Sequence, residues 1–247
     1  MTPTDILIRA DSVKQSAPPR CWAEDHLDHI RHNVREIRRH LRPGVRLMAV
    51  VKADGYGHGV VQSARAAVDA GADALAVNQL EEAMALRHAG LTEPILVLSP
   101  LQPSQVDVAV ELGLELAVFQ ASWLAEMRRW KKSRGILRLH IKMDTGMGRY
   151  GLRRREEFEE MLPLLMAEDI QVVGVYTHLA TADQEDDAYA RQQFARFMQM
   201  RKWLDLAGLG DVTAHCANSA AALRFPEFAL DMVRVGAALF VILFIYG

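Results

Sequence analysis

Short apolar runs recur along the chain and are separated by stretches in which apolar and charged residues alternate at helical spacing. The runs cover residues 46–52, 74–77, 94–99, 115–119, 136–142, 171–178, 212–216 and 230–235. Several of them are continuous and rich in Val, Ile and Leu, which is typical of strands buried on both faces. The pattern therefore predicts eight buried strands.

The segments between the strands carry helix signals. Helices are predicted over residues 27–41, 60–70, 80–89, 102–112, 155–167 and 186–206. Gly71, Gly90 and Gly113 stand where three of these helices would end. Regular alternation of strand and helix predicts a parallel sheet. Eight strands in this length favour a closed (β/α)8 TIM-type barrel over an open α/β sheet, with residues 20–236 as one domain.

The two ends of the chain differ from this pattern. Residues 1–19 mix charged residues with Ser and Thr and lack the apolar core of a signal peptide, so they are predicted to be a flexible tail. Residues 237–246 are apolar throughout but too short to span a bilayer as a helix. We expect a buried strand there, and we interpret residues 237–247 as the truncated start of a second domain.

Composition narrows the possible partners and compartment. The formal net charge is −2 and the sequence pI is about 6.5, which gives no reason to expect nucleic acid or a membrane as a partner. Cys21 and Cys216 follow neither metal nor disulfide spacing. We therefore expect a reducing, cytoplasmic location and no metal site.

In a barrel of this type, catalysis takes place where the strands end at their C-termini. The first such end reads Val-Val-Lys-Ala-Asp-Gly-Tyr-Gly-His-Gly, with the lysine at position 52. Desolvation at the end of an apolar strand lowers the pKa of a lysine and favours Schiff-base chemistry. Taken alone, Lys52 fits a solvated strand-end lysine equally well.

Four other strand ends carry polar residues. The fifth reads Lys-Met-Asp-Thr-Gly-Met-Gly-Arg over residues 142–149, and the sixth contains His178. Taken alone, Arg149 would more simply pair with Asp144 on the surface, and a single histidine would be structural. The seventh and eighth ends supply Ser219 and Gly236, and loops after strands seven and eight of such barrels often bind phosphate.

These five segments, in this order, resemble the N-terminal domain of alanine racemases, which are fold-type III enzymes that use pyridoxal 5′-phosphate (PLP). The similarity covers roughly residues 20–236. It implies that Lys52 forms an aldimine with PLP and that His178 packs near the pyridine ring and hydrogen-bonds the arginine beneath it. The residues that the resemblance places around the cofactor phosphate are Tyr56, Asn218, Ser219, Gly236 and Ala237.

The resemblance also assigns the cationic residues. Arg149 would hydrogen-bond the phenolic oxygen of PLP and face the substrate carboxylate, and Lys142 matches a lysine that is carbamylated in several members. Arg234 would contact the pyridine nitrogen and keep it unprotonated, because a guanidinium does not give up its proton. The implied activity is interconversion of L- and D-alanine for peptidoglycan, in a homodimer if the second domain is present.

Two departures from the family pattern matter. Asp25-His26 replaces an apolar–acidic pair in a segment, residues 22–28, that resembles the family's opening strand, and Ala237 replaces an isoleucine after Gly236. The second domain, which supplies a tyrosine base from a partner subunit, has no match.

A barrel-only PLP-binding homeostasis protein is the alternative function, although that family lacks the string around Lys52. A decarboxylase would place an acid at the pyridine nitrogen, where this chain has Arg234.

Overall fold

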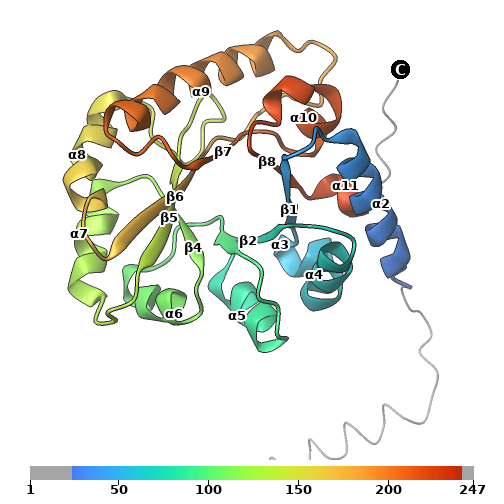
Figure 1. The fold of residues 1–247 in the computed structure, drawn as a ribbon, viewed down its shortest axis with the longest axis horizontal. Helices are drawn as coiled ribbons and strands as arrows, with labels where there is room; N and C mark the ends of the chain where they lie inside the picture. The colour runs from blue at the N-terminus through green and yellow to red at the C-terminus, as the bar shows by residue number, and fades with distance from the viewer. Residues whose placement is uncertain (1–23, 241–247) are drawn as a thin grey trace, which may run out of the picture.

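Eight parallel strands form a ring with helices on its outer face (Figure 1). The structure is a computed structural model that describes residues 24–240. The strands are β1 (Arg46–Val50), β2 (Ala74–Val77), β3 (Ile95–Val97), β4 (Glu115–Val118), β5 (Leu137–Lys142), β6 (Ile170–Tyr176), β7 (Thr213–His215) and β8 (Met232–Val235). Each lies within one or two residues of a predicted apolar run.

The order of the strands confirms a barrel over an open sheet. Neighbours in sequence pair in parallel from β1 to β7, and β8 pairs with β1. Between β7 and β8, backbone hydrogen bonds close the ring at 3.2 Å from Asp231 N to Ala214 O and at 2.9 Å from Arg234 N to Ala217 O. All eight C-terminal strand ends therefore open on the same side.

Helices fill the connections between strands. They are α2 (Leu27–His40), α3 (Lys52–Tyr56), α4 (Val60–Asp69), α5 (Leu80–His88), α6 (Val106–Glu111), α7 (Ala121–Trp130), α8 (Arg155–Leu165), α9 (Ala188–Leu206), α10 (Ser219–Arg224) and α11 (Ala237–Phe240), with 3-10 turns η1 (Pro103–Gln105) and η2 (Pro226–Phe228). The helix predicted over residues 102–112 is divided into η1 and α6. Helices α3, α7, α10 and α11 were not predicted.

The interior of the ring is apolar on one side and polar on the other. Met48, Ala74, Ala76, Leu96 and Met232 form a small apolar cluster inside β1, β2, β3 and β8. Buried ionisable side chains come from β4, β5, β7 and β8, namely Glu115, His140, Lys142, His215 and Arg234. Burial of such groups is costly unless each finds a partner, so this half of the barrel interior indicates a functional site.

The ends of the described region correct two predictions. Residues 237–240 form the helix α11 and not a strand, because Leu239 packs inward and its carbonyl accepts a hydrogen bond from Asn33 Nδ2 of α2 at 3.0 Å. The strand expected over residues 22–28 is also wrong where it is described, since α2 begins at Leu27. The predicted tail, residues 1–19, and residues 241–247 lie outside the described residues. Between residues 24 and 240, no helix has both the length and the apolar character that crossing a bilayer requires.

Candidate active site

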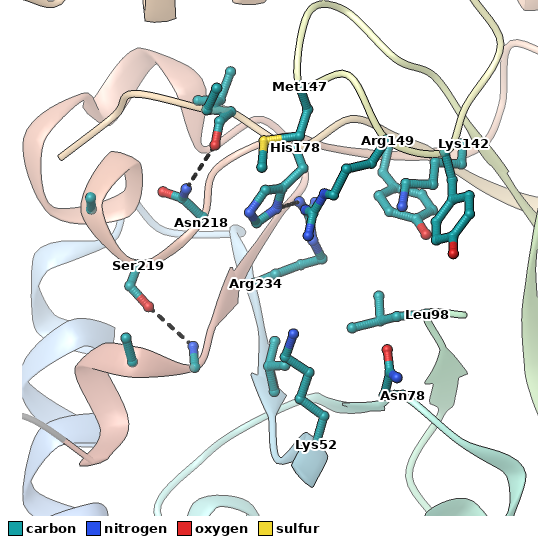
Figure 2. A pocket seen from close by; sticks show the side chains of 18 of the residues that line it. Lys52, Asn78, Leu98, Lys142, Met147, Arg149, His178, Asn218, Ser219 and Arg234 are labelled. Carbon is teal, nitrogen blue, oxygen red and sulfur yellow. Dashed lines mark hydrogen bonds between the residues drawn. The ribbon is translucent and has the colours of Figure 1, made fainter. Parts of the chain in front are cut away.

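One cavity of about 440 Å³ opens at the C-terminal ends of the strands. All ten residues singled out from the sequence line it: Lys52, Tyr56, Lys142, Arg149, His178, Asn218, Ser219, Arg234, Gly236 and Ala237. They come from five different strand ends, so the closure of the barrel brings together residues up to 185 positions apart in sequence. Figure 2 shows Lys52 and Arg149 entering the cavity from opposite sides, with the Arg234 side chain between them.

Lys52 is half-buried and follows β1 directly, at the start of the short helix α3. The backbone of α3 is left-handed: Ala53 has φ 53° and ψ 51°, and Asp54 has φ 52° and ψ 49°. The turn also brings Tyr56 to the site, where a Cβ at Gly236 would lie 2.3 Å from Tyr56 Oη. Glycine at position 236 is therefore what allows the tyrosine hydroxyl to reach the end of β8.

Arg234 lies on the inner face of β8 and is 5% exposed. Its guanidinium donates to Thr177 O at 2.7 Å, to His215 O at 3.0 Å and to His215 Nδ1 at 2.9 Å. Burial lowers its pKa from the ordinary value, but a guanidinium remains protonated in proteins. The site therefore contains a fixed, buried cation.

A chain of hydrogen bonds runs from Arg234 through the barrel interior. His215 Nε2 lies 2.9 Å from His140 Nδ1, and His140 Nε2 lies 2.8 Å from Glu115 Oε2. Although burial opposes it, the hydrogen bond from His140 holds the pKa of Glu115 below its ordinary value. Glycine at position 174 makes room for the chain, because a Cβ there would lie 2.1 Å from His140 Nδ1.

The arginine fixes the tautomers of both histidines. A guanidinium can donate only, so His215 Nδ1 must accept and His215 Nε2 must carry the proton. His140 Nδ1 then accepts, and His140 Nε2 donates to the carboxylate of Glu115. Burial, together with the charge of Arg234, lowers the pKa of His215 well below its ordinary value, which keeps this histidine neutral.

His178 lies beside Arg234 at the sixth strand end. Its Nδ1 lies 3.4 Å from Arg234 Nη2, which matches the predicted contact with the arginine beneath it. Burial, with the charges of Arg234 and Arg149, lowers the pKa of His178 to about 3. A neutral His178 ring at pH 7 follows from this lowered pKa.

Arg149 is not paired with Asp144, contrary to the simpler interpretation of the sequence. The Asp144 carboxylate accepts hydrogen bonds from the backbone of Gly146 and Gly148 and forms an ion pair with Arg153 at 2.8 Å. Arg149 makes no hydrogen bond or ion pair with the residues that the structure describes, and its side chain reaches the cavity. Its guanidinium is available to an anionic ligand.

Lys142 is buried at the end of β5 between two aromatic rings. Its Nζ lies 5.4 Å from the ring centroid of Tyr150 and 5.6 Å from that of Tyr176. Burial and repulsion from Arg149 and Arg234 lower its pKa to about 8. The Tyr176 hydroxyl is buried and finds no hydrogen-bond partner among residues 24–240.

This depressed pKa predicts a pH-dependent stability. Between about pH 8 and 10.5, Lys142 of the unfolded chain binds a proton that the folded chain lacks. The free energy of unfolding should therefore rise with pH across this window, by at most ~3 kcal/mol. Urea denaturation in carbonate-free buffer should show the rise in the parent chain and in Lys202→Met, an exposed control, but not in Lys142→Met. An equal slope in all three proteins would contradict the assignment.

The Ser219 hydroxyl and two backbone amides meet at the seventh and eighth strand ends. Ser219 Oγ accepts from Gly236 N at 3.1 Å and from Ala238 N at 3.3 Å. Asn218 caps α10 by accepting from Ala221 N at 3.0 Å, and its amide donates to Leu179 O (Figure 2). A hydroxyl and backbone amides that converge in this way suit an anion.

Several residues of the site were not identified from the sequence. Asn78 and Ser99 line the cavity and are joined by a hydrogen bond of 2.7 Å from Ser99 Oγ to Asn78 Oδ1. Their position at the second and third strand ends was the available signal. His140 and Glu115 lie within apolar strands, and only the alternation of inward positions on β4 and β5 could have indicated them.

Comparison with known proteins gives consistent results. A family model described as "Alanine racemase, N-terminal domain" matches residues 26–243. The alanine racemase of Desulforamulus reducens is 46% identical over 221 residues, which cover 89% of this chain and 60% of that protein. The alanine racemase of Geobacillus stearothermophilus is 44% identical over 220 residues, with 89% and 56% covered. The crystal structure of alanine racemase from Bacillus anthracis with bound L-Ala-P superposes with a TM-score of 0.87 at 41% identity, over 90% of this chain and 58% of that one. The chain thus spans little more than half the length of these relatives.

Proposed function

Since the chain belongs to the alanine racemase family through its N-terminal domain, we propose that it is the cofactor-binding barrel of a PLP-dependent amino-acid racemase that interconverts L- and D-alanine. The observation that carries the proposal is the convergence of ten residues from five strand ends on one cavity. A lysine amine, a buried cation and a cluster of anion-binding donors are combined there.

The residues of the cavity fit PLP at both ends of the cofactor. Ser219 Oγ, together with the amides of Gly236 and Ala238 that donate to it in this structure, would hold the phosphate, with Asn218, Ala237 and the Tyr56 hydroxyl beside it. Lys52 enters the same cavity from β1, which suits covalent attachment. When bound, PLP supplies an electron-withdrawing ring that makes the Cα proton of an attached amino acid acidic.

Arg234 and His178 determine the environment of the ring in this proposal. Arg234 is held by acceptors on Thr177, His215 and His178 and remains cationic, so it would donate a hydrogen bond to the pyridine nitrogen without protonating it. His178 packs near the ring as a neutral group, since its pKa is about 3. An unprotonated pyridine withdraws electrons less strongly, which limits side reactions such as transamination.

Arg149 and Lys142 serve the substrate side. Arg149, unpaired within the described residues, would bind the phenolic oxygen of PLP and the carboxylate of alanine. Lys142 has a pKa of about 8, so a large fraction of its amine is neutral at mildly alkaline pH and can add carbon dioxide to form a carbamate. The buried Tyr176 hydroxyl finds no hydrogen-bond partner among residues 24–240. A carbamate on Lys142 would supply an acceptor for it, which supports the modification.

Lys52 also serves as the acid/base group on one face of the substrate carbon. The second base, on the other face, would come from a second domain in a partner subunit of a homodimer, since the relatives are longer than this chain. A cytoplasmic role in supplying D-alanine for peptidoglycan completes the proposal. A barrel-only PLP-binding protein is the second candidate, supported by the observation that one cavity lined by residues between 50 and 237 contains all ten residues proposed for the site.

Covalent attachment of PLP to Lys52 is the decisive test. The purified chain with PLP should show yellow absorbance, and borohydride reduction followed by peptide mass spectrometry should find the cofactor on Lys52. Lys142, with its lowered pKa, is the rival amine. Lys142→Met should therefore keep the absorbance, whereas Lys52→Ala should lose it. Labelling of Lys142 in place of Lys52 would refute the proposed site.

A further inference from the structure

The turn that follows β1 has an unfavourable backbone. Ala53, Asp54 and Tyr56 have φ values of 53°, 52° and 54°, and Gly55 between them has φ 63°. For residues other than glycine the left-handed region is disfavoured, because Cβ approaches the following carbonyl oxygen. Such consecutive strained residues persist only when surrounding structure holds them, and they often occur at functional sites.

Glu82, in the first turn of α5, contacts this turn from outside. Its Oε1 accepts a hydrogen bond from Asp54 N at 3.1 Å. Its Oε2 accepts from Asn78 N at 2.8 Å and from Gln79 N at 3.1 Å. One carboxylate therefore joins the backbone at the end of β1 to the backbone at the end of β2.

We propose that Glu82 is a positioning residue that holds the left-handed turn and thereby directs Lys52 and Tyr56 into the cavity. The turn carries both residues at its two ends, so a change in its dihedral angles would move the lysine amine and the tyrosine hydroxyl together. A carboxylate suits the task because a negatively charged acceptor strengthens the hydrogen bonds of backbone amides. The inference rests on the proposed function in one respect, that Lys52 is the residue to which the cofactor attaches.

Amide exchange tests the contact without any cofactor. In Glu82→Ala, the Asp54 amide of the PLP-free chain should exchange with solvent at least about tenfold faster, since its charged acceptor is lost. Glu82→Gln keeps the size of the side chain but lacks the charge and should give a smaller acceleration. Glu81→Ala is the matched control, because Glu81 is exposed and lies in the same helical turn. Unchanged exchange at Asp54 in both Glu82 variants would overturn the proposal.

The second readout separates positioning from simple stabilisation of α5. Glu82→Ala should weaken PLP attachment to Lys52 by about tenfold, measured by borohydride trapping at increasing PLP concentrations. Adding Ala53→Gly should restore attachment, because glycine adopts left-handed angles without steric cost. It should not restore the melting temperature, since the hydrogen bonds to Asn78 and Gln79 remain lost.

Each result of the trapping experiment decides the inference. Attachment that is unchanged in Glu82→Ala, or that Ala53→Gly fails to restore, would show that Glu82 only stabilises its own helix. If Glu82→Ala does not fold, Glu82→Gln with and without Ala53→Gly gives the same comparison. If the parent chain itself attaches no PLP at Lys52, the proposed function fails, while Asp54 exchange still tells whether Glu82 holds the turn.

Discussion

The 247-residue chain, assayed by itself, should convert L-alanine to D-alanine on the order of 10²–10⁴-fold more slowly than when a second domain from a family member is supplied. Racemisation requires an acid/base group on each face of the substrate carbon. In the proposed function, Lys52 provides this group on one face. Loss of one positioned acid/base group has an effect of the stated size.

The tyrosines of the barrel are poor substitutes for the second base. Tyr176 is fully buried, and burial raises its pKa well above the ordinary value. Burial also raises the pKa of Tyr56, whose hydroxyl lies against the end of β8. Tyr150 is 52% exposed at the mouth of the cavity, where its ring lies beside Lys142. Water admitted at an open mouth would further weaken the electrostatic contacts of the site.

The assay compares the lone chain, the chain with a separately expressed second domain, and Lys52→Ala with the same addition. PLP attachment should be retained in the lone chain, so binding and turnover separate. A lone chain that reaches the rate of the supplemented one would contradict the expectation. Tyr150→Phe would then show whether Tyr150 supplies the second base.

The fold was largely predictable because buried parallel strands are continuous apolar runs. All eight runs coincide with strands, and their number indicated closure. The prediction was wrong at residues 237–240, where four apolar residues fit a buried strand and a buried helix equally well by pattern alone. Packing against α2, including the hydrogen bond from Asn33 to Leu239, favours the helix over a strand. No local sequence pattern reveals this tertiary contact.

The candidate site was predictable only in part. Strand ends indicated where candidate site residues lie, and the family resemblance selected ten that the structure brings together in one cavity. The hydrogen bond between His140 and His215 joins residues 75 positions apart, so no spacing rule identifies it. The left-handed turn after Lys52 contains Ala53 and Asp54, whose residue types do not by themselves predict positive φ angles. The pairing of Asp144 with Arg153, and not with Arg149, likewise depends on loop geometry.

Arg234→Glu should lower the free energy of unfolding by roughly 3 kcal/mol or more, because three buried acceptors lose their donor and face a carboxylate. In the chain supplied with a second domain, the same change should lower the racemisation rate and increase transamination, which is measured as pyruvate formed per D-alanine. An acid at the pyridine nitrogen protonates it and makes the ring a stronger electron sink. Arg234→Lys retains a cationic donor and should show little of the second effect. An unchanged ratio of pyruvate to D-alanine in Arg234→Glu would refute the contact.

The stability cost of Arg234→Glu should depend on Glu115, although Glu115 lies at the far end of the hydrogen-bond chain. A carboxylate at position 234 can only accept, so His215 must carry its proton on Nδ1. The tautomers of both histidines are then reversed. His140 Nε2 becomes an acceptor that faces the carboxylate of Glu115. Glu115→Gln can donate its amide to that nitrogen, so it should relieve part of the cost. Urea denaturation of the two single variants and the double variant should give a coupling of at least about 1 kcal/mol, with the double variant more stable than the sum of the single effects. Strictly additive costs would show that the two histidines do not transmit the polarity of Arg234 to Glu115.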